Sequence, residues 1–333
     1  MQELVAGVVR ERLSDVSIVK LLDGAIVFET ECSYDRLNFF CFNNIFAVID
    51  ILEAHDPELH IRKISAMGKN NGASLSEKAL AVISENNKKI KSFRLVCSNE
   101  NKPVSINENA KRSIENFIAH NSALKVDGAN PDTEYWFLYR REGFSLFMKR
   151  LTRPSDKNLH PGELPPQLAW LLCRAADLRP GETVIDPFCG YGSIPETALK
   201  HFHIKKVYAL DTDSRCIKIT GERQSMKSER CEIHRADFFT APPFLPAGGA
   251  DAIITDPPWG MYKETNIPLE EFYGNMLGLF FRLLRTGGRA VILTGAVKEL
   301  ESVAGKAGTF NTSRTIPILV SGKKASVFIL EKV

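Results

Sequence analysis

The sequence lacks several features that would assign it to a specialised class of protein. Its seven cysteines are widely spaced and no two form a Cys-x-x-Cys pair, so neither a disulfide framework nor a metal site is predicted. Its most apolar stretch, residues 39–52, is interrupted by Asn43, Asn44 and Asp50 and is too short and too polar to cross a membrane. The first residues carry charges at helical spacing and lack the apolar core of a signal peptide. These absences favour a reduced, cytoplasmic protein.

An excess of charge of one sign is also missing. Lys and Arg number 43 against 40 Asp and Glu, which gives a formal net charge of +3. A nucleic-acid partner would therefore have to be bound by local basic clusters, because the surface as a whole is not basic. The composition, 44% hydrophobic and 25% charged, is that of an ordinary globular protein, and 333 residues suit two hydrophobic cores better than one.

The first part of the chain, residues 1–152, mixes two kinds of apolar pattern. Short runs typical of strands occur, for example at residues 135–139 and 144–149, and helical patterns are predicted over residues 35–53, 74–87 and 105–120. This mixture predicts an α+β region. Residues 153–163 are rich in proline, glycine and polar residues, which predicts a linker to a second domain of residues 164–333.

The second domain shows a regular alternation of apolar strands and amphipathic helices. Strands are predicted at residues 182–188, 205–211, 229–237, 250–257 and 288–294. Such alternation predicts an α/β fold with a doubly wound, mostly parallel, Rossmann-like sheet. Two further strand-like runs between residues 316 and 330, separated by Ser-Gly-Lys-Lys, predict a terminal antiparallel hairpin at the edge of that sheet.

A glycine-containing loop, Asp186-Pro-Phe-Cys-Gly-Tyr-Gly-Ser193, follows the first strand of this domain. Small ligands of parallel sheets bind beyond the carboxyl ends of the strands, where this loop is expected. Gly190 and Gly192 permit a sharp turn, so N–H groups at the helix start can bind a carboxylate, and Asp186 can accept hydrogen bonds from an ammonium group. Pro195 stands where a dinucleotide site would have a third glycine, which disfavours NAD.

Acidic residues also end the second and third predicted strands. Asp211, with Asp213 as the second choice, can bind both hydroxyls of a ribose. Asp237 can bind an adenine amino group while Phe238 packs on the ring, although an aspartate in this position is more often a helix cap. The three strand ends together predict a nucleoside-containing cofactor.

The tetrapeptide Asp256-Pro-Pro-Trp259 ends the fourth predicted strand, beside the first. The exocyclic amine of a nucleobase is a poor nucleophile, because its lone pair is delocalised into the ring. Asp256 and the carbonyl of Pro257 can localise that pair by accepting the two amine hydrogens from a proline-stiffened turn. Trp259 offers a flat face on which an extruded base can stack. We therefore predict that Asp256, Pro257, Pro258 and Trp259 form the catalytic motif.

These motifs give the chain a resemblance to a known family. Residues 180–333 resemble class I S-adenosylmethionine methyltransferases, in the glycine loop and in the Asp-Pro-Pro-Trp motif. Residues 91–96, 111–118, 126–132 and 135–139 together resemble a THUMP domain, a tRNA-binding module of modification enzymes. Residues 164–169 resemble the segment that lines the cofactor pocket in such enzymes. The whole chain is thus similar to THUMP-containing tRNA guanine-N2 methyltransferases of the acceptor stem.

The resemblance implies a cofactor, a partner and a site. The cofactor is S-adenosylmethionine, the partner is structured RNA, most simply tRNA, and the reaction is methylation of the N2 amine of a guanosine. The cofactor-binding residues taken together are Leu164, Pro165, Asp186, Phe188, Gly190, Gly192, Ser193, Asp211, Thr212, Asp237 and Phe238.

Basic residues cluster in the first domain and at its junction with the second. The residues predicted to follow the RNA phosphates are Lys89, Lys91, Arg94, Arg140, Arg141, Lys149, Arg150 and Arg153.

Three alternatives stay open at this point. Asp-Pro-Pro-Trp also resembles the motif of RNA adenosine-N6 methyltransferases, because Asp256 and Trp259 stand where Asn and Tyr or Phe are usual. A related motif methylates protein glutamine amides, an alternative that the THUMP-like region disfavours. A catalytically silent RNA-binding protein on a methyltransferase scaffold is the third, and the intact acidic residues and glycines argue against it.

Overall fold

The computed structural model describes residues 1–33, 37, 39–53, 56–69, 75–85, 90–100, 102–152, 159–240, 243–260, 267–306 and 308–333. The chain divides into two compact units, one built from residues 10–155 and the other from residues 156–333 together with residues 3–9. Helix α1 (Gln2–Arg12) therefore contributes most of its length to the second unit, whereas the sequence prediction placed it in the first. No helix among the described residues is long and apolar enough to cross a membrane.

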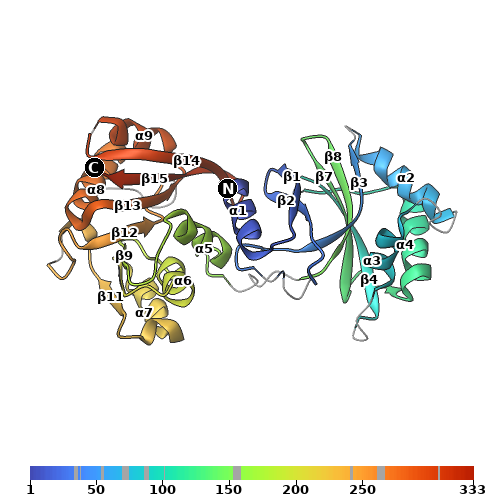
Figure 1. The fold of residues 1–333 in the computed structure, drawn as a ribbon, viewed down its shortest axis with the longest axis horizontal. Helices are drawn as coiled ribbons and strands as arrows, with labels where there is room; N and C mark the ends of the chain where they lie inside the picture. Colours follow the sequence, from blue (N-terminus) through green and yellow to red (C-terminus); the bar gives the residue numbers. More distant parts are fainter. Residues whose placement is uncertain are drawn as a thin grey trace. The chain divides into compact units, whose positions relative to one another are not determined.

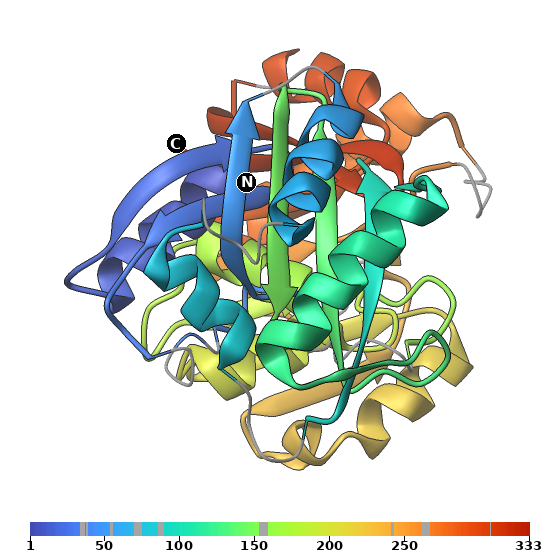
Figure 2. The same ribbon diagram turned by 90° about the vertical axis from the view of Figure 1, so that its right-hand side faces the viewer.

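The N-terminal unit is an α+β structure. It contains a hairpin of β1 (Ser17–Leu22) and β2 (Ala25–Glu29), and a sheet in the order β3-β8-β7-β4-β5, with β6 paired to β4. The sheet strands are β3 (Phe46–Glu53), β4 (Ser92–Asn99), β5 (Lys102–Pro103), β6 (Lys125–Val126), β7 (Thr133–Arg140) and β8 (Phe144–Arg150). Helices α2 (Pro57–Lys69), α3 (Glu77–Ser84) and α4 (Glu108–Ser122) cover one face of this sheet, as Figure 2 shows. Their apolar side chains and the aromatic side chains of the sheet form a buried core.

One predicted helix in this unit is wrong. The apolar pattern of residues 35–53 predicted a helix, but residues 46–53 form strand β3, which pairs antiparallel with β8 along its whole length. A short, nearly continuous apolar run fits a strand as well as a helix, and its periodicity cannot separate the two. Pairing with β8, which lies almost 100 residues later in the chain, decides the conformation here. Residues 35, 36 and 38 of the predicted helix lie outside the described residues.

The C-terminal unit has the predicted α/β architecture (Figure 1). Its sheet has the order β11-β10-β9-β12-β13-β15-β14, in which β11, β10, β9, β12 and β13 are parallel and the hairpin of β14 and β15 is antiparallel. The strands are β9 (Thr183–Asp186), β10 (Lys206–Asp211), β11 (Cys231–Arg235), β12 (Ala250–Thr255), β13 (Leu284–Thr294), β14 (Phe310–Val320) and β15 (Lys323–Lys332). The prediction of a parallel sheet with a terminal hairpin is confirmed.

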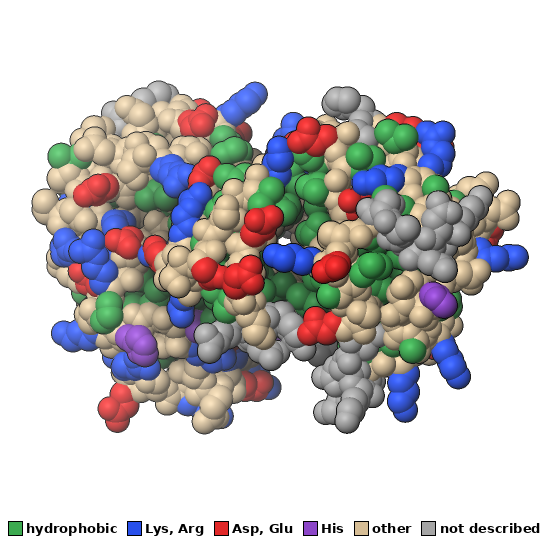
Figure 3. Space-filling model, turned by 45° about the vertical axis from the view of Figure 1, so that its right-hand side comes forward, with side chains coloured by type: hydrophobic (Ala, Val, Ile, Leu, Met, Phe, Trp, Pro, Cys, Tyr) green, Lys and Arg blue, Asp and Glu red, His purple; other side chains and the backbone are tan. Residues whose placement is uncertain are grey.

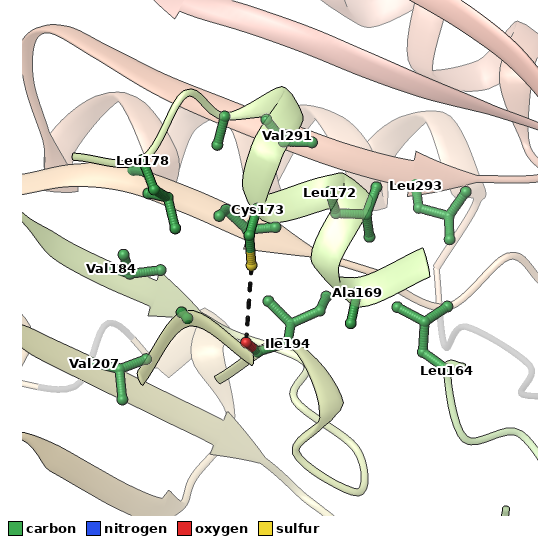
Figure 4. Close-up of a cluster of buried hydrophobic side chains, with 14 of the residues drawn as sticks. Leu164, Ala169, Leu172, Cys173, Leu178, Val184, Ile194, Val207, Val291 and Leu293 are labelled. Carbon is green, nitrogen blue, oxygen red and sulfur yellow. Dashed lines mark hydrogen bonds between the residues drawn. The ribbon is translucent and has the colours of Figure 1, made fainter. Parts of the chain in front are cut away.

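Helices pack on both faces of this sheet. The helices are α5 (Pro166–Ala175), α6 (Ser193–His201), α7 (Ser214–Glu222), α8 (Leu269–Leu283) and α9 (Val297–Lys306), with short 3-10 turns at Gln224–Lys227 and Phe238–Thr240. Side chains of α5 and α6 form a core with one face of the strands, and those of α8 and α9 form a second core with the other face. In Figure 4, Ala169, Leu172 and Cys173 of α5 point toward the strands and Ile194 of α6. The two cores hold the strand ends in fixed positions.

Candidate active site at the carboxyl edge of the parallel sheet

Three carboxylates meet at one edge of the C-terminal sheet. Asp186 ends β9, Asp211 ends β10, and Asp256 directly follows β12. Because these strands are adjacent and parallel, their carboxyl ends lie at the same edge. Burial raises the pKa of Asp186, and the negative charges of Asp211 and Asp256 add to this rise, so both lie within electrostatic reach of Asp186. The residues that the sequence singled out are therefore brought together.

The glycine loop adopts the conformation that its glycines permit. Both Gly190 (φ 52°) and Gly192 (φ 84°) have positive φ angles, and Gly192 precedes the first residue of α6. A Cβ atom on Gly192 would lie 2.7 Å from Cγ2 of Thr220, so this loop and α7 approach too closely for any side chain. The hydroxyl of Thr220 donates to the carbonyl of Gly190 over 3.0 Å. The loop is held in a tight, preformed shape at the start of α6.

Asp186 is buried and has one unused oxygen. Its Oδ1 accepts from Thr255 Oγ1 at 2.9 Å and from the backbone N–H of Phe188 at 3.3 Å. Its Oδ2 is buried with no hydrogen-bond partner among the described residues. Burial, together with the nearby Asp211 and Asp256, raises the pKa of Asp186 to about 8. A buried acceptor without a partner is costly, and an ammonium group of a ligand would satisfy it.

Asp211 and Asp213 accept different backbone hydrogen bonds. Asp211 is nearly buried, and its carboxylate accepts from the backbone N–H of Gly190 at 2.9 Å and of Asp213 at 2.8 Å. Asp213 is instead the N-cap of α7, where it accepts from the N–H groups of Arg215 and Cys216. Thr212 between them is exposed. Both aspartates accept backbone hydrogen bonds, so these contacts do not separate them, and Asp211 at the end of β10 stays the predicted ribose ligand.

At the third strand end, Asp237 has the capping role that the sequence analysis gave as the alternative, and the expectation for Phe238 is wrong. Asp237 is exposed and accepts from the N–H of Phe239 at 2.9 Å, which caps a short 3-10 turn. Phe238 is 1% exposed and packs against the rings of Phe188 and Phe280 in the second core. Its ring therefore has no free face for an adenine, and the stacking role expected for Phe238 is corrected. Half-buried Phe188 lies closer to the surface at this edge.

The Asp-Pro-Pro-Trp turn is held by two hydrogen bonds. The indole Nε1 of Trp259 donates to Oδ1 of Asp256 over 2.8 Å, and the hydroxyl of Tyr273 on α8 donates to the carbonyl of Pro258 over 3.2 Å. Burial raises the pKa of Asp256 to about 7, against the lowering effect of the Trp259 hydrogen bond. Trp259 is half-buried and packs against the first core. Tyr273 was missed by the sequence analysis, because nothing in a helix sequence indicates which turn it will reach.

The segment before α5 lies beside the glycine loop. Leu164 is buried in the first core, as Figure 4 shows, and Pro165 is the N-cap residue of α5. The hydroxyl of Ser193 is 3.4 Å from Oε1 of Glu163. These contacts connect the segment to the start of α6, directly after the glycine loop.

The predicted RNA-binding cations are in very different environments. Lys149 is buried and donates to the carbonyls of Val82 and Glu85, and Arg140 is buried against the carbonyl of Asp23. These two side chains therefore hold the N-terminal unit together and are not exposed phosphate contacts, which corrects the sequence prediction.

The remaining predicted cations are partly exposed, paired or undescribed. Arg94 and Arg150 both pair with Glu134, Arg141 is exposed and pairs with Asp23, and Lys91 is exposed. On the face drawn in Figure 3, Lys and Arg side chains are interspersed with Asp and Glu side chains. Lys89 and Arg153 lie outside the described residues.

The C-terminal sheet has the strand order of a class I methyltransferase, and its acidic residues lie at the same edge as in that class. The unused oxygen of Asp186 and the tight loop at Gly192 fit the cofactor of that class, so the C-terminal unit is an S-adenosylmethionine-dependent methyltransferase domain. Residues 153–317 match the RMKL-like, methyltransferase domain family.

Individual proteins similar to this chain carry related names. The tRNA (guanine(6)-N2)-methyltransferase of Thermus thermophilus is 29% identical over 248 residues, 72% of this chain and 72% of that protein. The U6 snRNA (guanine-N(2))-methyltransferase THUMPD2 of Mus musculus is 25% identical over 204 residues, 59% of this chain but 37% of that protein. Among solved structures, TrmN from Thermus thermophilus has a similar fold, with a TM-score of 0.73, 21% identity, and coverage of 99% of this chain and 96% of that one.

Proposed function

We propose that this chain transfers a methyl group from S-adenosylmethionine to the exocyclic N2 amine of a guanosine in structured RNA. The observation that carries the proposal is the Asp256 turn, which lies beside the buried, partly unsatisfied Asp186 at the cofactor edge of a methyltransferase fold. The names of the similar Thermus and mouse proteins support guanine-N2 as the target.

The residues of this edge have separate tasks in the proposed reaction. Asp186 binds the ammonium group of the cofactor through Oδ2, and Asp211 binds its ribose. The N–H groups at the start of α6 face its carboxylate. The cofactor supplies an electrophilic methyl group on sulfonium sulfur. Holding donor and acceptor in line accounts for most of the catalysis, since no covalent enzyme intermediate is needed.

Asp256 and the Pro257 carbonyl act on the target amine. Each accepts one amine hydrogen, which localises the nitrogen lone pair toward the methyl group. The nitrogen must lose one of these protons when it gains the methyl group, and ionised Asp256 would take that proton. Oδ1 of Asp256 is occupied by Trp259, so Oδ2 is the oxygen that accepts the amine hydrogen. The guanosine must leave its stack to reach this turn, and the ring of Trp259 supports the extruded base.

The N-terminal unit holds the RNA in this proposal. Its THUMP-like segments and the exposed Lys91 and Arg141 support this role, with residues 153–163 joining it to the methyltransferase domain. Backbone phosphate contacts of this kind position the RNA without reading its sequence.

Mass spectrometry of nucleosides tests the function. Unmodified tRNA transcripts and a U6 snRNA transcript are incubated with the chain and methyl-labelled S-adenosylmethionine, then digested. Labelled N2-methylguanosine in either RNA is the expected result. If label appears only in N6-methyladenosine, the target is the N6 amine of an adenosine and not the N2 amine of a guanosine. If the chain binds the cofactor but no label appears in any RNA or in protein glutamine, the result would support a catalytically silent RNA-binding protein on a methyltransferase scaffold.

Cofactor binding is also expected to release a proton. Because the pKa of Asp186 is raised to about 8, its carboxyl is largely protonated at pH 7 before the ligand binds. An ammonium group at Oδ2 favours the ionised form, so binding of S-adenosylhomocysteine at pH 7 should release a proton from Asp186, and affinity should rise from pH 6 to pH 8. Calorimetry in two buffers of different ionisation enthalpy measures the release. Asp186→Asn should abolish it, and equal heats in both buffers with the wild type would contradict it.

A further inference from the structure

A chain of hydrogen bonds leads from β13 to the reaction turn. Tyr273 is fully buried on α8, with its hydroxyl 3.2 Å from the Pro258 carbonyl and 2.7 Å from Thr294 Oγ1. Thr294 Oγ1 is also 2.9 Å from the backbone nitrogen of Ala296. The amide N–H of Ala296 can only donate and the Pro258 carbonyl can only accept. The directions are therefore fixed: Ala296 donates to Thr294, Thr294 donates to Tyr273, and Tyr273 donates to Pro258.

This series of hydrogen bonds fixes the orientation of more than one carbonyl. The ring of Pro258 sets its own φ angle, and the hydrogen bond from Tyr273 sets the direction of its carbonyl and hence its ψ angle. With both angles fixed, the peptide before Pro258, which carries the Pro257 carbonyl, has one orientation relative to α8. The Pro257 carbonyl is one of the two proposed acceptors for the target amine.

The second acceptor is fixed from within the turn. Trp259 Nε1 holds Asp256 Oδ1 at 2.8 Å, which stops the carboxyl from rotating and leaves Oδ2 for the amine. A phenylalanine or tyrosine ring at this position would offer a stacking face but no N–H donor. Among the described residues, Asp186 at the end of β9 and Tyr273 on α8 face Asp256, whose charge contributes to the raised pKa of each.

We propose that Tyr273 and Trp259 are positioning residues, which fix the Pro257 carbonyl and the Asp256 carboxyl as a preset pair of acceptors for the target amine. This assignment rests on the proposed function. It gives Tyr273 a role in the reaction and gives Trp259 a second role besides stacking. Preset acceptors raise the rate because they do not have to reorganise as charge develops on the amine.

The first test compares two identical changes at matched tyrosines. Tyr273→Phe removes only the hydroxyl. Tyr135→Phe removes a hydroxyl from an equally buried tyrosine on β7 that donates to the Ile83 carbonyl over the same 3.2 Å. Both variants should lose thermal stability, Tyr273→Phe the more, because its hydroxyl has two hydrogen-bond partners and that of Tyr135 has the Ile83 carbonyl. With saturating cofactor and saturating amounts of the transcript that the wild type methylates fastest, Tyr273→Phe should lower kcat roughly tenfold, and Tyr135→Phe should not.

A structural role alone predicts a different result. If both variants keep the wild-type kcat, Tyr273 does not position the turn. Should Tyr273→Phe fail to fold, Thr294→Val interrupts the same hydrogen-bond chain one step earlier and should lower kcat without changing affinity for S-adenosylhomocysteine. Unchanged kcat in folded Thr294→Val would likewise overturn the assignment.

The second test uses the pH profile of Trp259→Phe. The change keeps an aromatic face but removes the donor that stabilises ionised Asp256, so the pKa of Asp256 should rise further above its already raised value of about 7. Because the ionised carboxyl is the acceptor, the acidic limb of the kcat profile should move to higher pH. Part of the activity lost at pH 7 should return at pH 8.5.

Adding Asp256→Asn to Trp259→Phe shows whether the shifted acidic limb comes from titration of Asp256 or from altered packing of the turn. An amide does not titrate, so this acidic limb should disappear in the double variant. A lower melting temperature with an unmoved limb in Trp259→Phe would show that the indole N–H has only a packing role. If the wild type methylates neither RNA, the proposed function is wrong. If the wild type is active and the variants keep its rate and pH profile, only the positioning roles are wrong.

Discussion

Replacement of Asp256 by alanine is expected to lower the single-turnover rate of methyl transfer by about 10²–10³. The change removes one of the two acceptors that localise the lone pair of the target amine. It leaves the glycine loop, Asp186 and Asp211 intact, so the affinity for S-adenosylhomocysteine should stay within about twofold of the wild type. Rapid-quench measurements with saturating RNA and cofactor give the rate, and calorimetry gives the affinity.

Asp251→Ala is the matched control for this prediction. Asp251 lies on the same strand, β12, but at its amino end, where it accepts from Arg285 and from the backbone N–H of Thr183. Its loss should cost stability, about 1–3 kcal/mol, without changing the rate. A folded Asp256→Ala variant that transfers methyl groups at nearly the wild-type rate would rule out the proposed activation of the amine.

Gly192→Ala is expected to cost about 2–5 kcal/mol of folding free energy and to weaken cofactor binding at least tenfold. A positive φ angle of 84° costs a residue with a Cβ atom ~1–2 kcal/mol. The new Cβ would also lie 2.7 Å from Thr220 Cγ2, and relief of that overlap costs about 1–3 kcal/mol more. Because α7 carries Thr220, the loop must move away from it, and the N–H groups of the loop move with it. Chemical denaturation and calorimetry measure the two effects.

Gly190 provides a control in the same loop. It also has a positive φ angle, 52°, but nothing lies within 4 Å of the Cβ that alanine would add. Gly190→Ala should therefore show only the conformational cost, about 1–2 kcal/mol. Adding Thr220→Ala to Gly192→Ala removes the overlapping atoms and should restore part of the binding. Equal effects of the two glycine substitutions would mean that the contact with α7 does not shape the cofactor loop.

The sequence by itself was sufficient for the α/β architecture and for the order of its strands along the chain. Strands β9, β10, β12 and β13 each contain a short apolar run and are each followed by a helix, whereas β11 is more polar and is followed by a short 3-10 turn. Such patterns are local, and in an alternating α/β chain they leave few topologies. The same local patterns placed Asp186, Asp211 and Asp256 at strand ends. Because parallel strands bring their carboxyl ends to one edge, these residues could be expected at the same edge of the sheet.

Tertiary structure alone decided which side chains at these positions are available and which are already used. Lys149 and Arg140 appear in the sequence as surface cations, but backbone carbonyls from distant segments bind them inside the N-terminal unit. Phe238 lies in the core because aromatic rings from other elements surround it. Strand β3 depends on pairing with β8, and the hydrogen bond from Tyr273 to the reaction turn depends on how α8 packs against that turn, 15 residues earlier in the chain. A local pattern determines the type of an element and the residue at its end, whereas burial and hydrogen-bond partners depend on which distant segments the folded chain brings into contact.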